Sequence, residues 1–300
     1  MLLINDKGEV VLREKRSTPK PATPEALIRL IRLILADAAA IEEKGREPAL
    51  AGLGVCIAGF IETEKQIVHQ SPNLNWHTPV PFGKLLAEDF TCPVIIENDA
   101  NAAVLGEVYF GSATGHDNVI YITLSTGIGG GLFLNGRLYR GATGFAGEIG
   151  HIKPYGTGRE CKCGGCDCLE TWASGSAIAK SASLLWDEKT IESGGFSAEE
   201  VFAMADKGNE LASTIINNAA EQTGRGLANL VTLLNPSCIV IGGGVASGRP
   251  DYFKKVIDLM EAYSIKPSVK ITSVEVTKAQ LEPEAGIWGM YALLTGQAVK

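Results

Sequence analysis

The feature that most constrains this sequence is a short segment rich in cysteine. His151 is followed by Cys161-x-Cys163-x4-Cys168. Three thiolates and one imidazole are the ligand set that a tetrahedral structural zinc ion prefers, and a loop this short lets the sulfur atoms converge. Cys166 lies in the same segment, so the spacing alone leaves it as an alternative ligand. We expect a loop held together by a structural zinc ion. The alternative is a set of unrelated buried or disulfide-linked cysteines.

Composition and charge narrow the class of protein. The 300 residues carry a net charge of -7, and no basic block appears among them. Such a chain is unsuited to binding the phosphate backbone of a nucleic acid. Its apolar runs are shorter than the ~20 residues that a membrane span needs, and its N-terminus lacks the features of a signal peptide. We therefore expect a cytoplasmic protein with no nucleic-acid or membrane partner.

Helical and strand patterns alternate along the first part of the chain, which indicates an α/β fold. We expect a hairpin over residues 2–13 and an amphipathic helix over 24–44. Strands are expected at 50–57 and 93–97. The second strand leads directly into a helix-forming stretch over 100–109.

A second lobe is expected to begin near residues 111–115. Its expected elements are strands at 118–124, 131–134 and 237–241 and helices at about 210–234 and 251–263. A last helix over 284–294 would return to the first lobe. We therefore divide the chain into a small lobe, residues 1–112 with the C-terminal helix 283–300 packed back on it, and a large lobe, 113–282, with the zinc loop.

Two glycine-rich segments are candidates for phosphate binding. The run from Thr126 to Gly131 lies between two strands, where exposed backbone N–H groups suit a phosphate. It is neither a Walker loop nor a dinucleotide fingerprint, because it lacks Gly-Lys-Ser/Thr and a strand follows it. The triplet Gly242 to Gly244 follows an apolar strand, at the edge where ligands gather in α/β sheets. Each segment also fits a structural role, as a tight hairpin or as close packing of a helix on a strand.

Several carboxylates and one imidazole are candidate catalytic or binding groups. Asn98 and Asp99 come directly after a buried strand, and an ionised Asp99 could take a proton from a sugar hydroxyl. The competing interpretation makes Asp99 a helix cap. Glu148 and Glu170 flank the metal loop, which would hold their carboxylates as acceptors for hydroxyl groups, unless both are surface residues. His151 could bind metal through one ring nitrogen and a ligand hydroxyl through the other.

Together these segments resemble the ROK family of sugar kinases, repressors and open reading frames. The run from Gly127 to His151 is similar to the family signature over its whole length. The segment from Cys161 to Glu170 resembles the family zinc loop, CxCGxxGCxE, with Asp167 in place of the second glycine. The segment from Glu97 to Ala103 matches the one that carries the catalytic aspartate.

The resemblance implies an actin-like, ribonuclease H-like fold of two lobes, with ATP and magnesium in the reaction. It makes Asp99 the catalytic base. The residues that it assigns to sugar binding are Gly59, Asn98, Asp99, Glu148, His151 and Glu170. Those that it assigns to ATP are Thr126, Gly127, Gly243 and Gly244. Gly59 lies in a stretch that resembles the family's Pro-Gly sugar loop, with Ala58 at the proline position. The resemblance also implies a homodimer or homotetramer.

The implied function is ATP-dependent phosphorylation of a hexose, most simply glucose to glucose 6-phosphate. The run from Ser71 to Trp76 is similar to that of glucokinases. Fructose, mannose, allose and N-acetylmannosamine are the alternative substrates. A non-catalytic sugar sensor is the alternative function, although the acidic chain has no basic recognition helix like that of the DNA-binding repressors.

One departure from the family pattern concerns the N-terminus. Family kinases begin with a strand that ends in Asp-x-Gly-Gly-Thr and organises the ATP phosphates. Here the run from Met1 to Asn5 resembles the strand that follows it. We therefore expect the first strand to be missing, which leaves either a start codon assigned too far downstream or weakened catalysis.

Overall fold

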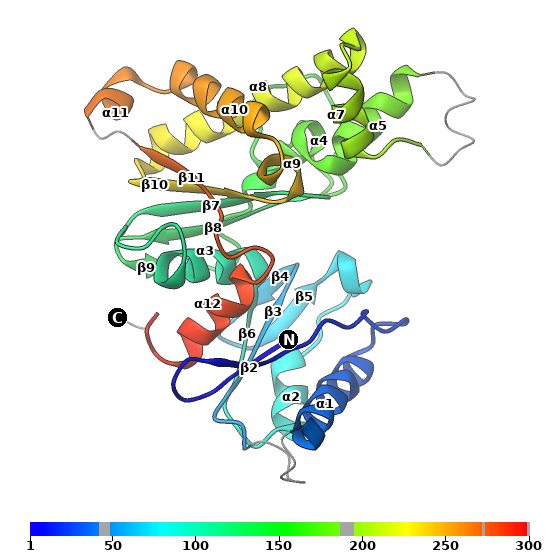
Figure 1. Cartoon of the computed structure of the whole chain (residues 1–300), viewed down its shortest axis with the longest axis vertical. Helices are drawn as coiled ribbons and strands as arrows, with labels where there is room; N and C mark the ends of the chain where they lie inside the picture. The colour runs from blue at the N-terminus through cyan, green and yellow to red at the C-terminus, as the bar shows by residue number, and fades with distance from the viewer. Residues whose placement is uncertain (42–48, 187–194, 272–273, 299–300) are drawn as a thin grey trace.

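The computed structural model describes residues 1–41, 49–186, 195–271 and 274–298. Figure 1 shows a smaller N-terminal half and a larger half stacked along the longest axis, with the C-terminal helix beside the first half. This arrangement is the mixed α/β, two-lobed fold expected from the sequence. None of the described helices combines the length and the apolar composition needed to cross a membrane.

Among its described residues, the N-terminal half contains three two-stranded ladders, two α-helices and a 3-10 turn at Pro72–Leu74. The ladders are the antiparallel pair β1 (Leu2–Ile4) and β2 (Val10–Arg13), the parallel pair β3 (Leu53–Ile57) and β6 (Val94–Asn98), and the antiparallel pair β4 (Phe60–Glu62) and β5 (Ile67–Gln70). The helices are α1 (Pro24–Ile41) and α2 (Phe82–Asp89). Apolar side chains of these elements, among them Ile61, Phe82, Leu86 and Ile96, form one buried cluster. The predicted hairpin is present, and residues 42–44 of the helix predicted over 24–44 lie outside the described residues.

The larger half is built on one five-stranded sheet in the order β11-β10-β7-β8-β9. Its strands are β7 (Val119–Leu124), β8 (Ile128–Leu134), β9 (Arg137–Leu138), β10 (Cys238–Gly242) and β11 (Glu275–Lys278). Side chains alternate between its faces, as the pleat requires. Ile120, Ile122 and Ile239 point to the helices above the sheet, whereas Tyr121 and Val240 join the cluster below it.

The helices of this half cover the upper face in Figure 1. They are α4 (Glu170–Ala173), α5 (Gly175–Leu185), α7 (Ala198–Asp206), α8 (Glu210–Leu234), α9 (Gly244–Ser247), α10 (Pro250–Tyr263) and α11 (Lys266–Ile271). Ser197 begins α7 with a capping box, and Asn209 caps α8. The two helices predicted at 210–234 and 251–263 are present.

Two helices lie between the halves. The side chains of α3 (Asp99–Phe110) pack on the lower face of the five-stranded sheet, and α12 (Ala285–Leu294) packs against α3 and β3. Residues 299 and 300 of the segment predicted to pack back on the small lobe lie outside the described residues. Because α3 contacts the sheet of the larger half, the division of the chain at residue 112 stays a prediction.

Candidate active site

The site begins where β6 ends and α3 starts. Asn98 is the last residue of the strand and caps the helix, because its Oδ1 accepts hydrogen bonds from the backbone N–H groups of Ala100 (2.9 Å) and Asn101 (3.0 Å). Asp99 is therefore the first helical residue rather than the cap. One of its carboxylate oxygens accepts the Ala100 N–H at 3.0 Å, so the other oxygen is available for a ligand.

The side chain of Asn98 also ties α3 to the loop after β3. Its Nδ2 donates to the carbonyl oxygen of Gly59 at 3.0 Å. Gly59 has a φ of 144°, and a Cβ there would collide with the carbonyl oxygen of Gln70, so only glycine fits. These hydrogen bonds leave Asn98 with one amide hydrogen that could bind a ligand.

Two other carboxylates act electrostatically on Glu148 at this point. Burial raises the pKa of Glu148 to about 7, and the negative charges of Asp99 and Glu170 add to the effect. Burial also raises the pKa of Asp99 above its ordinary value of 3.8, against the opposing effect of the Ala100 N–H. Asp99 and Glu170, which are far from each other in the sequence, therefore both lie near enough to Glu148 for their charges to raise its pKa.

His151 lies between these carboxylate residues and the cysteine loop. Its Nε2 lies 3.8 Å from Oε2 of Glu148, and its Nδ1 lies 3.9 Å from Sγ of Cys161. The ring thus faces the carboxylate of Glu148 with one nitrogen and the thiol of Cys161 with the other.

The four predicted metal ligands are gathered in space. One ligand atom from each of His151, Cys161, Cys163 and Cys168 lies within 4.8 Å of the others. Ligands held ~2.3 Å from a tetrahedral zinc are separated by ~3.8 Å. The distance of 3.6 Å between the sulfur atoms of Cys163 and Cys168 fits that geometry. Cys166 is exposed and outside this group, so the cluster is compatible with a zinc ion held by the other four.

Asp167, the departure from the family zinc loop, has a structural explanation. Its φ is 57°, which is the left-handed region that glycine enters most easily. Aspartate tolerates this region, and here its carboxylate accepts backbone N–H groups of Thr157 (2.9 Å), Gly158 (2.9 Å) and Arg159 (3.0 Å). The replacement therefore adds hydrogen bonds that tie the cysteine loop to the preceding segment.

Glu170 links the cysteine loop to the glycine-rich turn. Its Oε2 accepts the backbone N–H of Ile128 at 2.9 Å, and a Cβ on Gly127 would lie 2.7 Å from the same oxygen. The carboxylate of Glu170 and the candidate phosphate-binding turn are thus adjacent.

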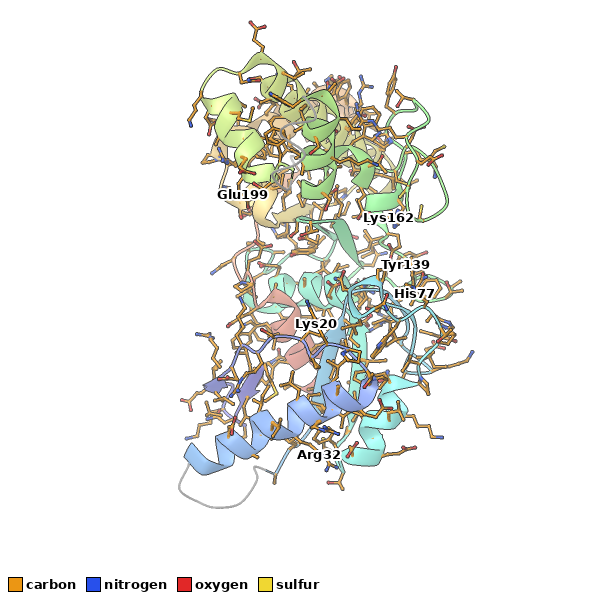
Figure 2. The ribbon with its side chains drawn as sticks, turned by 90° about the vertical axis from the view of Figure 1, so that its right-hand side faces the viewer. Lys20, Arg32, His77, Tyr139, Lys162 and Glu199 are labelled. Atoms are coloured by element: carbon orange, nitrogen blue, oxygen red, sulfur yellow. The ribbon has the colours of Figure 1, made fainter. Side chains whose placement is uncertain are left out.

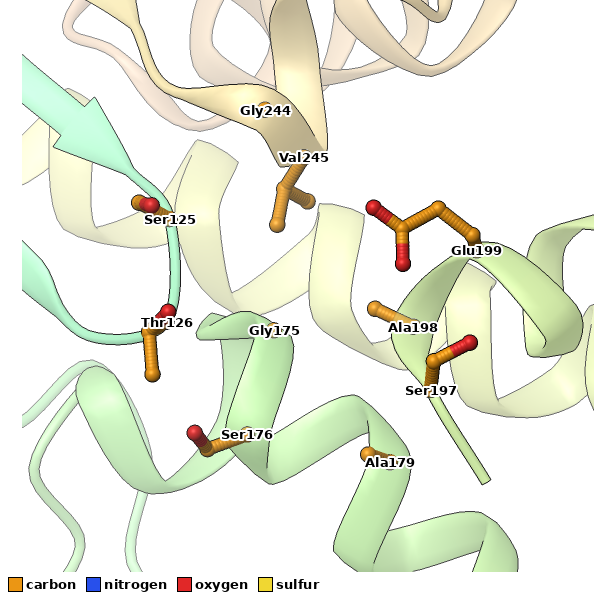
Figure 3. A pocket seen from close by; sticks show the side chains of 10 residues that line it. All are labelled: Ser125, Thr126, Gly175, Ser176, Ala179, Ser197, Ala198, Glu199, Gly244 and Val245. Atoms are coloured by element: carbon orange, nitrogen blue, oxygen red, sulfur yellow. The ribbon is translucent and has the colours of Figure 1, made fainter.

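A cavity of about 280 Å³ opens beside this turn (Figure 3). The residues that line it are Ser125, Thr126, Gly175, Ser176, Ala179, Ser197, Ala198, Glu199, Gly244 and Val245. Figure 3 shows the carboxylate of Glu199 pointing across the cavity toward Val245. Thr126 and Gly244 were assigned to ATP from the sequence, and both line this cavity.

Gly243, also assigned to ATP, is not among the lining residues. It has a φ of 90°, and a Cβ would collide with the backbone of Leu124. Its N–H donates to the carboxylate of Glu282 at 2.5 Å. Close packing on β7 therefore accounts for Gly243, whereas Gly244 has open space around it.

The family is decided by comparison with known proteins. The model of the ROK family matches residues 1–297. The chain belongs to the ROK family.

Relatives of this ROK chain differ in function. A glucokinase of Halalkalibacterium halodurans is 38% identical over 250 residues, which cover 80% of this chain and 74% of that protein. A xylose repressor of Bacillus subtilis is 33% identical over 253 residues, or 83% of this chain and 62% of the repressor. Among solved structures, a ROK glucokinase of Streptomyces griseus in complex with glucose and AMPPNP has a TM-score of 0.78 and 30% identity, covering 97% of this chain and 94% of that one.

Several residues of the ROK chain's cavities were missed by sequence reasoning. Ser176 and Glu199 line the first cavity, yet each belongs to a helix start that looks like ordinary capping sequence. A larger cavity of about 500 Å³ lies in the small half between residues 18–24 and 73–80. Its lining includes Lys20 and His77, labelled in Figure 2, and none of the predicted site residues.

Proposed function

We propose that this chain is an ATP-dependent sugar kinase that phosphorylates a hexose hydroxyl, with glucose as the first candidate and glucose 6-phosphate as its product. The observation that carries the proposal is that Glu148 feels the charges of Asp99 and Glu170, and that Glu170 bonds to the glycine-rich turn beside a cavity of about 280 Å³. Carboxylates and an imidazole offer the acceptors and donors that a polyhydroxylated ring needs. The glucokinase relatives support glucose as the substrate.

The proposed reaction assigns each group one task. The hydroxyl of the sugar transfers its proton to the free oxygen of Asp99 while its oxygen attacks the γ-phosphorus. The bond from the γ-phosphorus to the bridging oxygen breaks, and ADP leaves. ATP would arrive as its magnesium complex, in which the ion offsets part of the phosphate charge.

Sugar recognition falls to the residues around Asp99. Glu148 and Glu170 would accept hydrogen bonds from hydroxyl groups, His151 would bind one through Nε2, and Asn98 would offer its remaining amide hydrogen. Gly59 would shape the loop that faces the sugar. A zinc ion on the cysteine cluster would hold His151 in place from its Nδ1 side.

Nucleotide binding is assigned to the cavity beside the glycine turn. Thr126 and Gly127 would lie next to the phosphates, and Gly244 next to the adenosine. Gly243 would support this site through its packing on β7 rather than by direct contact.

A coupled assay of ADP release across a panel of hexoses tests the proposal. We expect turnover with glucose and a loss of about 10²- to 10⁴-fold in kcat for Asp99→Asn, since the general base is removed. Asp6→Asn, an exposed change in the β1–β2 turn, serves as the control. Equal turnover by the Asp99→Asn variant and the wild type would show that Asp99 is not the base.

A non-catalytic sugar sensor is the second candidate, and the xylose repressor relatives favour it. Isothermal titration calorimetry separates the two functions. Binding of a sugar together with ATP or its analogue supports the kinase, whereas sugar binding without any nucleotide binding supports the sensor.

A further inference from the structure

The carboxylate of Glu97 is the centre of a buried polar network next to the proposed base. Glu97 precedes Asn98 on β6, and its side chain is 1% exposed. It accepts hydrogen bonds from the backbone N–H of Asn98 (2.9 Å) and from Nδ2 of Asn101 (3.2 Å). Nε of Arg140 donates to the other carboxylate oxygen at 2.8 Å, and Oγ1 of Thr63 donates to Oε1 at 3.3 Å.

Arg140 comes from a different part of the chain, just after β9. Its side chain reaches Glu97, 43 residues away in the sequence. Its carbonyl oxygen accepts the backbone N–H of Ala146 at 3.0 Å and so closes the loop 140–146. Glu148 follows this loop by two residues. One arginine therefore contacts the strand that leads to Asp99 and the loop that leads to Glu148.

The same loop rests on the β4–β5 hairpin of the small half. The ring of Phe145 packs edge-on against Phe60, with 5.4 Å between ring centroids, and against His69 at 6.0 Å. A Cβ on Gly144, whose φ is 92°, would lie 2.6 Å from the carbonyl oxygen of Ile61. The loop has little room to move against the hairpin while these contacts hold.

We propose that Arg140 and Glu97 are positioning residues of the sugar site. Their ion pair fixes the spacing between Asp99, which would take the proton, and Glu148, which would bind sugar hydroxyls. Neither residue needs to contact the sugar for this role. The inference rests on the proposed function, because it assigns a task in the binding of the same substrate.

Breaking the ion pair between Arg140 and Glu97 should disturb the residues that would bind the sugar. Without Arg140, a buried carboxylate loses its charged partner, and both the end of β6 and the loop relax to solvate it. Small displacements of groups that bind or activate a substrate have large kinetic effects. The cavity beside Thr126 is lined by other segments, so nucleotide binding should change little.

Steady-state kinetics of three variants and one control test the inference. The variants are Arg140→Gln, Glu97→Gln and Arg140→Lys, and the control is Arg137→Gln, an exposed arginine three residues earlier. We expect Arg140→Gln to raise the sugar KM by about 10-fold or more and to leave the ATP KM within about twofold. Arg140→Lys keeps the charge without the planar guanidinium and should fall between the wild type and Arg140→Gln.

The double variant Arg140→Gln/Glu97→Gln separates positioning from general destabilisation. Because the two residues act as one unit, its sugar KM should resemble that of either single variant rather than their product. Multiplying effects, or equal rises in the sugar and ATP KM, would overturn the inference. So would a sugar KM in all three variants equal to that of Arg137→Gln.

Calorimetry with the wild type keeps this test distinct from that of the proposed function. If the wild type binds sugar without turnover, the affinities of the same variants for sugar and nucleotide are compared in place of their KM values. The same outcomes then support or overturn the inference. If it neither binds nor phosphorylates any sugar, the proposed function fails and this inference fails with it.

Discussion

At the scale of single residues, the cap of α3 determines what Asp99 can do. Asn98 caps the helix by accepting the N–H groups of Ala100 and Asn101, and Asp99 shares only the Ala100 N–H, so it keeps one oxygen for chemistry. The sequence left two interpretations of Asp99 open, a helix cap or a catalytic base, because asparagine and aspartate both cap helices well. Only the positions of the hydrogen bonds separate them. The same holds for Asp167, whose backbone conformation no short motif predicts.

The raised pKa of Asp99 gives a prediction for the pH profile. The base must be ionised to accept a proton, so kcat/KM for the sugar should fall as pH drops through this pKa. Because burial raises the pKa, the acid limb should lie above the ordinary aspartate value of 3.8. Rate measurements from pH 4 upward, at about one-unit steps, would locate the limb. An acid limb at or below 3.8 would contradict the raised pKa and the assignment of Asp99 as the base.

The same shift predicts a gain in stability when the charge is removed. A carboxyl group whose folded pKa is raised binds its proton more tightly in the folded state, so its relative stabilisation is full at low pH and is lost as pH rises through the folded pKa. Asp99→Asn should therefore raise the melting temperature at pH 7. The difference from the wild type should shrink as pH falls toward 4, and Asp6→Asn should show neither effect. A lower melting temperature for Asp99→Asn at pH 7 would contradict the prediction.

Asp167 allows the backbone and the side chain to be tested separately. Asp167→Gly keeps easy access to the positive φ but loses the three acceptor contacts to residues 157–159. Asp167→Ala loses the contacts and also strains the backbone, which should lower its melting temperature by a further ~2–4 °C. Thermal unfolding followed by circular dichroism gives the order wild type, glycine variant, alanine variant. Equal values for glycine and alanine would show that the φ of this position is not constrained.

At the scale of elements, the glycine runs serve packing, beside the ligand binding proposed for them. Gly129 to Gly131 lie inside β8, which begins at Ile128 rather than at the predicted residue 131. They pair with β7, and the absence of side chains lets Ala100 of α3 and the loop before Ile149 approach the strand. Sequence reasoning could not separate the two roles, because the partner elements are distant in the chain.

Gly131 tests this packing directly. A Cβ at Gly131 would lie 2.5 Å from the carbonyl oxygen of Ala100, in the first turn of the helix that starts with Asp99. Gly131→Ala should cost about 1–3 kcal/mol of the free energy of unfolding, as overpacking does. It should also lower kcat, because α3 must shift. Gly248→Ala, where a Cβ would meet no atom within 4 Å, is the control. Urea unfolding and the coupled assay give both values, and matching results for the two variants would contradict the packing argument.

At the scale of the whole molecule, local patterns predicted the α/β fold, the order of the main elements and the four residues of the cysteine cluster. They did not predict which segments meet. Glu170 bonds to Ile128, Glu97 to Arg140, and Glu282 to Gly243, each across about 40 residues. Such pairs depend on the final arrangement of sheets and helices, and no periodicity or spacing encodes them. The active site is therefore a property of the assembled lobes, although its residues are recognisable one at a time.

A zinc ion on the cysteine cluster would extend this dependence to a metal. Cys163→Ser should lose the bound zinc and lower the melting temperature, whereas Cys166→Ser, an exposed cysteine outside the cluster, should retain about one zinc per chain. Elemental analysis by mass spectrometry measures the zinc.

Because His151 faces Cys161 with Nδ1 and Glu148 with Nε2, loss of the ion should also free the imidazole and raise the sugar KM more than the ATP KM. Zinc retention by Cys163→Ser, or equal loss in both variants, would show that the ligand set is wrong. Zinc loss with an unchanged sugar KM would show instead that the metal supports the fold without orienting His151.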